Sequence, residues 1–359
     1  MIHENHVILQ ASVSTKLLFW HLEMAFLLLI LLTGILFIRI GEIFPALQGI
    51  EFFFYLFVPC FIMSFSNVMR QLSQRNLQTQ PITLCVFMIL LADVLSNLTH
   101  FNFVGVADHG VSSLKNVMYY LVLISQVNTS LRFRQLLFWI WLFCLVFIIL
   151  VLLNHFGVIK LSIMEAFNDS YESETGETMR VKRMTGSGLF GDPNDMCMVI
   201  VTGLVLGFYL MGDNLFPLPR LVYLASAIVF GYALKQTQSR GGFIAFMAAC
   251  GMTMLARFGW KKAVMAGAAV LPVVLIVFKG RLTAISTKEG TAHTRIQLWS
   301  DGLSYFKSSP LFGIGTGKYA EFSHHVAHNA YVHAYAEMGL LGGGPFVGAF
   351  FLPFGRFTI

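Results

Sequence analysis

The chain has 359 residues, of which 56% are hydrophobic and 12% charged, and its mean hydropathy is +0.71. Because a soluble domain is typically about a quarter charged, this composition excludes an ordinary soluble protein and indicates a polytopic membrane protein. The net charge of +6 comes from basic residues scattered among apolar runs, which argues against nucleic-acid binding. The five cysteines lie in or beside apolar segments at irregular spacing, so they predict neither a disulfide framework nor a cysteine metal site.

Apolar runs long enough to cross a bilayer recur along the chain. A spanning helix needs roughly 20 mostly apolar residues, and about ten segments qualify. The first is too long for the core of a signal peptide, so we expect it to remain as a span. We therefore predict an all-α fold, a polytopic inner-membrane helical bundle of about ten transmembrane helices. The predicted spans are 17–38, 50–66, 81–98, 112–130, 136–156, 187–211, 219–236, 242–256, 262–279 and 330–354.

Two connections, 157–186 and 280–329, are longer than a turn. The first is charged and poor in aromatic residues, so we expect a mobile surface loop. Short basic connections favour the cytoplasmic side, which places both long loops and Arg240 outside if the N-terminus is cytoplasmic. The predicted domains are therefore a bundle of about nine spans over 1–279, a compact extracytoplasmic catalytic loop over 280–329, and a last transmembrane helix over 330–359. The basic residues that set this orientation are Arg70, Arg75, Arg132, Arg134, Arg220, Arg257, Lys261 and Lys262.

The second loop carries a helical pattern that begins at Arg295. Its apolar residues recur at helical spacing among polar ones, which predicts a helix lying on the membrane surface. The sequence Ser-Ser-Pro at 308–310 is expected to stop this helix. The glycines that follow would let the backbone turn tightly or approach a ligand closely. The apolar positions are Ile296, Trp299, Leu303 and Phe306, and the glycines are Gly313, Gly315 and Gly317.

His328 and Asn329 come just before the last apolar run, at the predicted mouth of a helix in the outer leaflet. An imidazole there can take a proton from a hydroxyl near neutral pH. Alternatively, His328 caps or hydrogen-bonds the helix end. The spacing of His324 and His328 also raises a zinc site, but no carboxylate or cysteine stands at matching spacing, so we expect no metal.

Two further motifs open predicted spans. Arg240 is followed by Gly241 and Gly242, which would give a large anionic group access to backbone and guanidinium together; alternatively, the arginine reaches phospholipid headgroups. In the sequence GDPND at 191–195, Asp192 fits an N-cap and Pro193 a first helical residue, which favours capping over catalysis. Glu23 and Asp93 are acids within spans without a basic partner one turn away, and no role is assigned to them.

Together these stretches resemble the O-antigen ligase-like family of bacterial envelope glycosyltransferases. The ordered match covers roughly half the chain, from Gly188 to Gly342. Each motif alone is weak, whereas the whole series in order is fairly specific. The matching stretches are GDPND at 191–195, SRGG at 239–242, Arg295 with Trp299, SPLFGIG at 309–315, HNAY at 328–331 and EMGLLG at 337–342.

The resemblance implies that a glycan moves from an undecaprenyl diphosphate carrier to an acceptor hydroxyl on a lipid A core sugar, a growing polysaccharide or a protein. It implies a metal-independent, inverting transfer with no cofactor, on the periplasmic face of the inner membrane. By this resemblance His328 is the base, and Arg240 and Arg295 hold the diphosphate. The residues expected to contact substrate are Asn194, Ser239, Gly241, Trp299, Asn329 and Tyr331.

The chain departs from the family pattern at its end, because members usually continue through further spans after EMGLLG whereas this chain stops at Ile359. We expect Pro345 and Pro353 to interrupt the last span. A short member and a truncated, inactive one both fit. A flippase or transporter of lipid-linked sugars is a competing hypothesis, and it predicts charges along a path through the spans. A non-catalytic membrane subunit is a third hypothesis.

Overall fold

The computed structural model describes residues 23–43, 47–161, 167–172, 178–213, 218–265, 267–268 and 291–352. They form two compact units. Unit 1 is Met1–Cys60 with Val127–Ser286, and unit 2 is Phe61–Gln126 with Thr287–Ile359. Most of the predicted span 262–279 and the start of the predicted external loop lie outside the described residues, as does Pro353.

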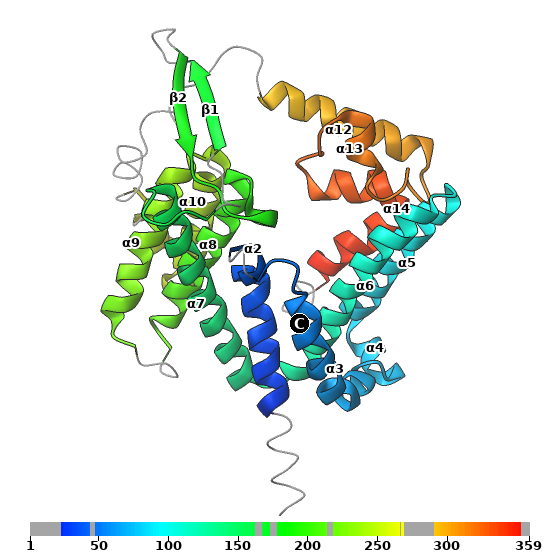
Figure 1. Cartoon of the computed structure of the whole chain (residues 1–359), viewed down its shortest axis with the longest axis horizontal. Coiled ribbons are helices and arrows are strands. Elements are labelled where there is room, and N and C mark those ends of the chain that lie inside the picture. The colour runs from blue at the N-terminus through cyan, green and yellow to red at the C-terminus, as the bar shows by residue number, and fades with distance from the viewer. Residues whose placement is uncertain are drawn as a thin grey trace, which may run out of the picture. The chain divides into compact units, whose positions relative to one another are not determined.

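Unit 1 is built on apolar helices around one core (Figure 1). Trp141, Phe147 and Phe230 are among its largest fully buried side chains. The ion pair between Glu23 and Arg132, 3.1 Å apart, gives this acid of the first span a distant partner. The helices of unit 1 are Glu23–Ile38, α2 (Ile40–Ile43), the start of α3 (Phe52–Gln71), α7 (Ser130–His155), α8 (Pro193–Leu210), α9 (Arg220–Thr237) and α10 (Arg240–Phe258).

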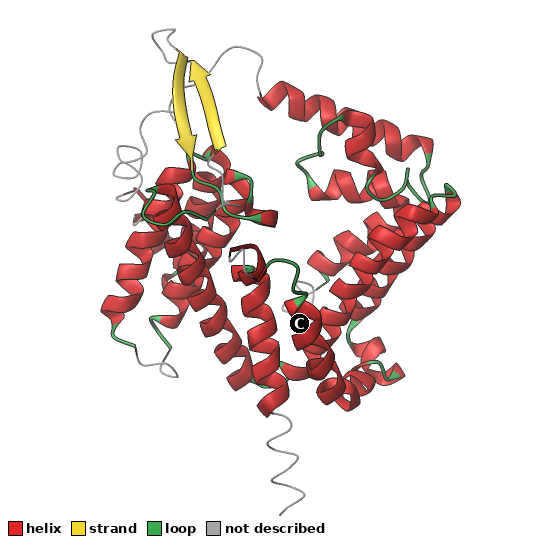
Figure 2. Cartoon of the chain, in the orientation of Figure 1, coloured by secondary structure: helices red, strands yellow, loops and turns green. Residues whose placement is uncertain are grey.

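The predicted loop 157–186 is not irregular throughout. The strands β1 (Phe167–Glu172) and β2 (Thr178–Arg183) pair antiparallel, with Phe167 opposite Arg183 (Figure 2). The fold is mostly helical, as the all-α prediction expected, and this hairpin is a short exception to it. Its charged sequence hides the signal, because alternation of apolar and polar residues is weak there. After β2, the backbone N–H of Met184 donates to the carbonyl of Gln236 at the end of α9.

Unit 2 packs α5 (Pro81–Thr99) between α6 (Phe103–Gln126) and α14 (Ala330–Phe351). The buried face of α5 carries polar residues: Ser113 of α6 donates a short hydrogen bond to Asp93, and Ser96 donates to the carbonyl of Glu337 in α14 at 2.5 Å. Its other helices are the rest of α3, α4 (Gln74–Thr79), α12 (Thr291–Ser308) and α13 (Lys318–Ser323).

Among the described helices, five are long and apolar enough to cross a membrane: α3, α5, α7, α8 and α10. The helix Glu23–Ile38 is apolar but shorter. These helices leave large apolar side chains exposed, such as Ile62 at 66% and Ile244 at 67%, as lipid-facing surfaces do. The chain is thus a mostly helical, multi-pass membrane protein. The predicted count of about ten spans is not confirmed.

The last predicted span is not one continuous helix. At Gly339, inside α14, φ is 61° and ψ is −156°. The chain folds back there, so the Tyr331 ring lies 5.9 Å from that of Phe346. We expected proline to break this segment, but Pro345 lies within helical structure and the break is at Gly339. The part after the break, 340–351, reaches only about 18 Å at 1.5 Å per residue, less than the roughly 30 Å hydrocarbon core.

Candidate active site

The start of α8 and the start of α10 meet through a side-chain hydrogen bond. Ser239 donates from Oγ to Oδ1 of Asn194 at 2.6 Å, and the same Oγ accepts from the backbone N–H of Gly242 at 3.0 Å. Asp192 caps α8 by accepting from the N–H of Asn194 at 2.7 Å, as its place before proline predicted. Two motifs that are 45 residues apart in sequence therefore form one structural element.

Arg240 is the first residue of α10 and its side chain is exposed. A Cβ at Gly241 would meet nothing within 4 Å, whereas one at Gly242 would collide with Cys197 of α8. Gly242 thus allows the two helices to pack closely, and Gly241 leaves the first turn of α10 open. Unpaired N–H groups and the positive end of the helix dipole gather at such a start. This end of unit 1 suits an anionic group.

Arg183 is a buried arginine at the same end of unit 1, and the sequence analysis missed it. It is the last residue of β2, is 7% exposed, and donates from Nε to the carbonyl of Thr237 at 2.9 Å. Thr237 lies two residues before Ser239, so Arg183 supports the turn that leads into Arg240. The run of basic residues near its position carried no periodic signal that would have marked it as buried.

In unit 2, α12 holds the segment that ends at His328. Trp299 donates from Nε1 to the carbonyl of Ala327 at 3.0 Å, and Ala327 is fully buried. Arg295 lies one helical turn before Trp299 on α12 and is exposed. The helix ends at Ser308, as the Ser-Ser-Pro sequence predicted. The structure thereby brings Arg295, Trp299 and the segment before His328 into one neighbourhood.

His328 stands at the start of α14 but does not cap it. Asn329 is the N-cap, and its Oδ1 accepts from the N–H groups of Tyr331 at 3.0 Å and Val332 at 3.3 Å. The His328 side chain is exposed, with a left-handed backbone at φ 49°. The alternative in which His328 caps the helix is therefore wrong, because the neighbouring Asn329 amide fills that role. The imidazole is left at the surface beside the helix start.

The glycine-rich turn docks on the break in α14. Breaking a helix leaves backbone donors and acceptors without partners. Here the N–H of Ile314 donates to the carbonyl of Ala336 at 3.0 Å, and that of Gly315 to Glu337 at 3.2 Å. In return Leu340 donates to the carbonyl of Pro310 at 2.8 Å. The backbone groups of the turn and those at the break in α14 thus supply each other's hydrogen-bond partners.

Gly313 of this turn and Gly339 of α14 allow that docking. A Cβ at Gly313 would collide with the backbone of Glu337, and one at Gly339 would come within 2.5 Å of the Leu311 carbonyl. Both glycines have positive φ, at 71° and 61°, which is strained for any other residue. The SPLFGIG and EMGLLG stretches therefore meet through their backbones, at the break in α14.

A family model described as O-antigen ligase matches residues 225–347. This match supports the resemblance of the chain to the O-antigen ligase-like family. The matched residues contain Arg240, Arg295 and His328, and they end within the second half of α14. No curated protein and no solved structure matches the chain. The family supports an enzyme of O-antigen ligation or polymerisation.

The predicted catalytic residues of the O-antigen ligase domain lie in both units. Arg240 lies in unit 1, whereas Arg295 and His328 lie in unit 2. Asn194 precedes the matched residues, yet Ser239 of the domain holds its side chain. Tyr331 is 42% exposed and its ring packs on Phe346. That these residues act on one substrate stays a prediction.

The domain also holds a side-chain network around Glu337, a residue of the EMGLLG stretch to which the sequence assigned no role. Glu337 is 4% exposed, accepts from the backbone N–H of Tyr319 at 3.0 Å, and pairs with Nε2 of His333 at 3.1 Å. The ring of His333 stacks on Tyr319 with centroids 5.0 Å apart. Burial, with the nearby Asp301 carboxylate, raises the pKa of Tyr319, so its hydroxyl stays protonated and donates to the carbonyl of Leu298. Glu337 and His333 therefore anchor α13 to α14.

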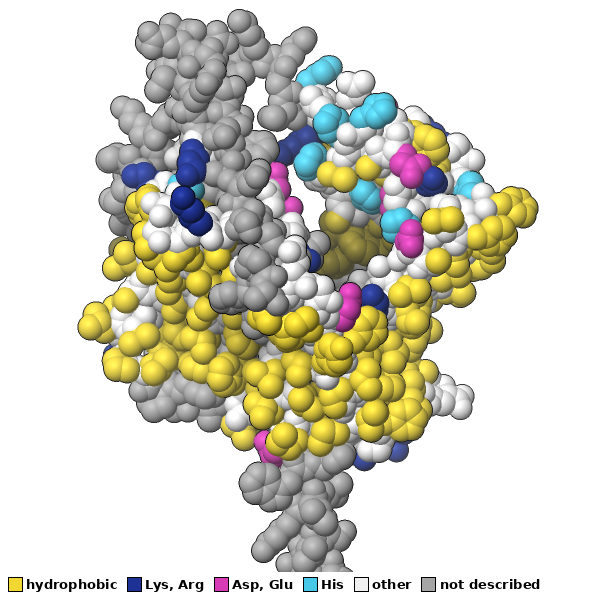
Figure 3. Space-filling view, viewed as in Figure 1, with side chains coloured by type: hydrophobic (Ala, Val, Ile, Leu, Met, Phe, Trp, Pro, Cys, Tyr) yellow, Lys and Arg dark blue, Asp and Glu magenta, His cyan; other side chains and the backbone are white. Residues whose placement is uncertain are grey.

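Histidines gather on the face of unit 2 formed by α12, α13 and the start of α14 (Figure 3). The side chains of His324, His325 and His328 are exposed there. In the described part of the chain, no group of three or more His, Cys, Asp or Glu side chains is placed to hold a metal ion. The polar end of unit 2 thus presents imidazoles and the Arg295 guanidinium to solvent.

Proposed function

We propose that the protein transfers a glycan from an undecaprenyl diphosphate carrier to an acceptor hydroxyl, on a lipid A core sugar or a growing polysaccharide. The observation that carries the proposal is the Trp299–Ala327 hydrogen bond. It fixes the segment before His328 against α12, one turn from Arg295. A base and a cation on one rigid support are what transfer from a sugar diphosphate requires.

The chemistry assigns one role to each side chain. His328 accepts the proton as the acceptor oxygen forms its bond to the anomeric carbon of the donor sugar. The bond from that carbon to the diphosphate oxygen breaks, and the electron pair leaves with the undecaprenyl diphosphate. Arg240 and Arg295 stabilise the charge that develops on this leaving group. Attack from the face opposite the diphosphate inverts the anomeric configuration.

No metal or cofactor enters this scheme, because a diphosphate already leaves readily once its charge is clamped. Joining Arg240 with Arg295 and His328 rests on the order of the motifs in the O-antigen ligase family. The open first turn of α10 supports a phosphate contact for Arg240. We place the site on the periplasmic side of the bacterial inner membrane, from the distribution of basic residues in the short connections.

The test is transfer by purified protein in liposomes that contain an undecaprenyl diphosphate glycan. Product on lipid A core indicates a ligase, and a ladder without core lipid indicates a polymerase. Arg240→Gln and Arg295→Gln should each lower transfer by about a hundredfold or more, the loss expected for a group that stabilises developing charge. Folded wild-type protein that binds donor yet transfers glycan to neither acceptor would refute the proposal.

A further inference from the structure

Arg39 occupies an unusual backbone position in unit 1. It lies between the helix Glu23–Ile38 and α2, with φ at 51°, a left-handed conformation that is strained for arginine. Its N–H still donates to the carbonyl of Ile35 at 2.8 Å, and its carbonyl accepts from Ile43 at 3.2 Å. The apolar chain is thus bent at a charged residue while its hydrogen bonds are kept, and the strain points to a role for the side chain.

The guanidinium of Arg39 lies against Gly188. A Cβ on Gly188 would coincide with Nη1 of Arg39, and Gly188 itself has φ of 54°. The short helix η2 (Gly188–Phe190) leads within four residues to Asp192, the cap of α8. Arg39 therefore lies at the end of unit 1 where α8 begins and where Asn194 binds Ser239.

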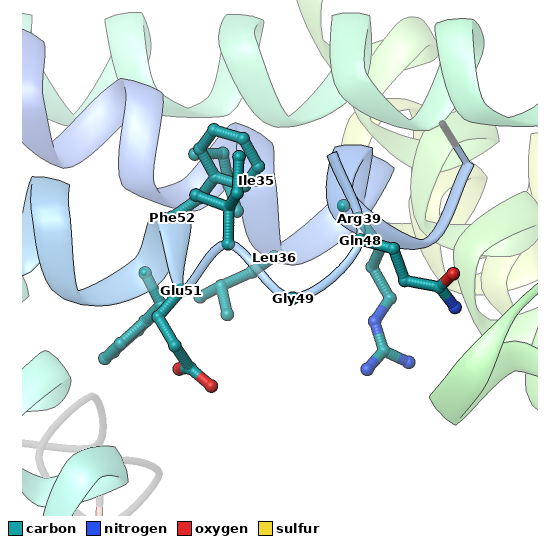
Figure 4. A pocket seen from close by; sticks show the side chains of 10 residues that line it. Ile35, Leu36, Arg39, Gln48, Gly49, Glu51 and Phe52 are labelled. Atoms are coloured by element: carbon teal, nitrogen blue, oxygen red, sulfur yellow. The ribbon is translucent and has the colours of Figure 1, made fainter. Parts of the chain in front are cut away.

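The same arginine lines a cavity of about 380 Å³ (Figure 4). Ile35, Leu36 and Phe52 are among its apolar wall residues. Polar groups come from Arg39, Gln48 and Glu51, and the Arg39 and Glu51 side chains extend to the same side of the ribbon in Figure 4. An apolar wall with a few polar groups at one side is typical of a small-molecule site.

We infer that this cavity binds the phosphate end of a polyprenyl phosphate, with Arg39 on the phosphate and the first isoprene units along Ile35, Leu36 and Phe52. Guanidinium groups bind phosphate through paired, charge-assisted hydrogen bonds. The carboxylate of Glu51 and the amide of Gln48 suit sugar hydroxyls, which they can hydrogen-bond. The inference rests on the proposed function, since it assigns part of the donor to unit 1.

A free phosphate or a phospholipid headgroup shares the chemistry that Arg39 would recognise. The cavity favours a polyprenyl chain because its wall is apolar next to the cation, which a free diphosphate would not use. A cavity of this size holds only part of the donor, so the rest of the carrier lies in the bilayer. Binding of undecaprenyl phosphate should accordingly depend on both the phosphate and the chain.

The test measures binding of undecaprenyl phosphate to the full chain in detergent, by native mass spectrometry. Arg39→Gln should weaken binding about tenfold or more, since a charge-assisted bond is lost. Gly188→Ala keeps the charge but displaces the guanidinium, and should weaken binding in the same direction. The matched control is Arg220→Gln, which removes an exposed cation at the first residue of α9. It should leave binding unchanged.

Further arms compare undecaprenol, phosphatidylglycerol and inorganic pyrophosphate. Weak binding of all three supports the inference. If phosphatidylglycerol competes as well as undecaprenyl phosphate, the cavity is a general lipid site. If pyrophosphate competes equally well, it is a site for soluble anions. Either result overturns the inference. So does wild-type affinity in folded Arg39→Gln, or a wild-type protein that does not bind undecaprenyl phosphate. If the wild-type protein transfers glycan but Arg39→Gln does not change binding, only this site is refuted. If binding depends on Arg39 but the wild-type protein transfers no glycan, only the proposed function is refuted.

Discussion

The hydrogen bond from Trp299 to Ala327 predicts a specific defect in Trp299→Phe. Phenylalanine keeps an aromatic ring on α12 but removes the Nε1 donor. The carbonyl of Ala327, in a fully buried residue, then lacks its partner. We expect the segment that leads into His328 to loosen while α12 itself stays folded.

The size of the defect follows from the cost of an unpaired buried acceptor, about 1–3 kcal/mol. At roughly 1.4 kcal/mol for each factor of ten, the full cost would slow transfer between about fivefold and a hundredfold. The Asn329 cap still holds the start of α14, so only part of this cost reaches His328. We predict a fall of about tenfold.

The assay is steady-state glycan transfer with purified protein. A residue that positions the base lowers kcat and leaves KM nearly unchanged, whereas a residue that only contacts substrate raises KM. Trp260→Phe is the matched control, because Trp260 is 65% exposed and lies outside the site. A raised KM with unchanged kcat in Trp299→Phe would refute the positioning role, as would an equal loss in both variants.

Three further predictions test the fold and its orientation. Gly313→Ala should lower the unfolding midpoint, since strain at positive φ and collision with the α14 backbone each cost about 1–3 kcal/mol. The control Gly251→Ala lies in open space on α10 and should raise the midpoint or leave it unchanged. Equal midpoints in the two variants would contradict the docking of the turn. Ser239→Ala should cost about 1 kcal/mol through the lost cap on α10, measured by thermal unfolding, and an unchanged midpoint would show that the cap contributes nothing. Lys307→Cys, in a background without the native cysteines, should react with an impermeant maleimide in intact spheroplasts, and labelling only after lysis would reverse the proposed topology.

Local sequence signals predicted several elements correctly. The Asp-Pro pair marks the start of α8, because aspartate caps and proline fits the first helical position. The Ser-Ser-Pro sequence ends α12 at Ser308, since proline blocks helix continuation. These features depend on neighbouring residues alone, which is why the sequence contains them.

Contacts between residues far apart in the chain could not be predicted from the sequence. The glycines after Ser308 suggested either a turn or a ligand site, and only the paired break at Gly339 shows that Gly313 meets backbone. The bond between Asn194 and Ser239 likewise joins two motifs that looked independent. Arg39 carried no signal, because its left-handed backbone and its contact with Gly188 are visible only in three dimensions.

The central claim is that His328 is the base for glycan transfer. Its most direct test compares His328→Ala with His325→Ala, a neighbouring exposed histidine, in single-turnover transfer with saturating donor. General-base catalysis contributes about a hundredfold to ten-thousandfold, so His328→Ala should fall by that range while His325→Ala keeps the wild-type rate. Wild-type transfer by folded His328→Ala, or an equal loss in both variants, would contradict the claim.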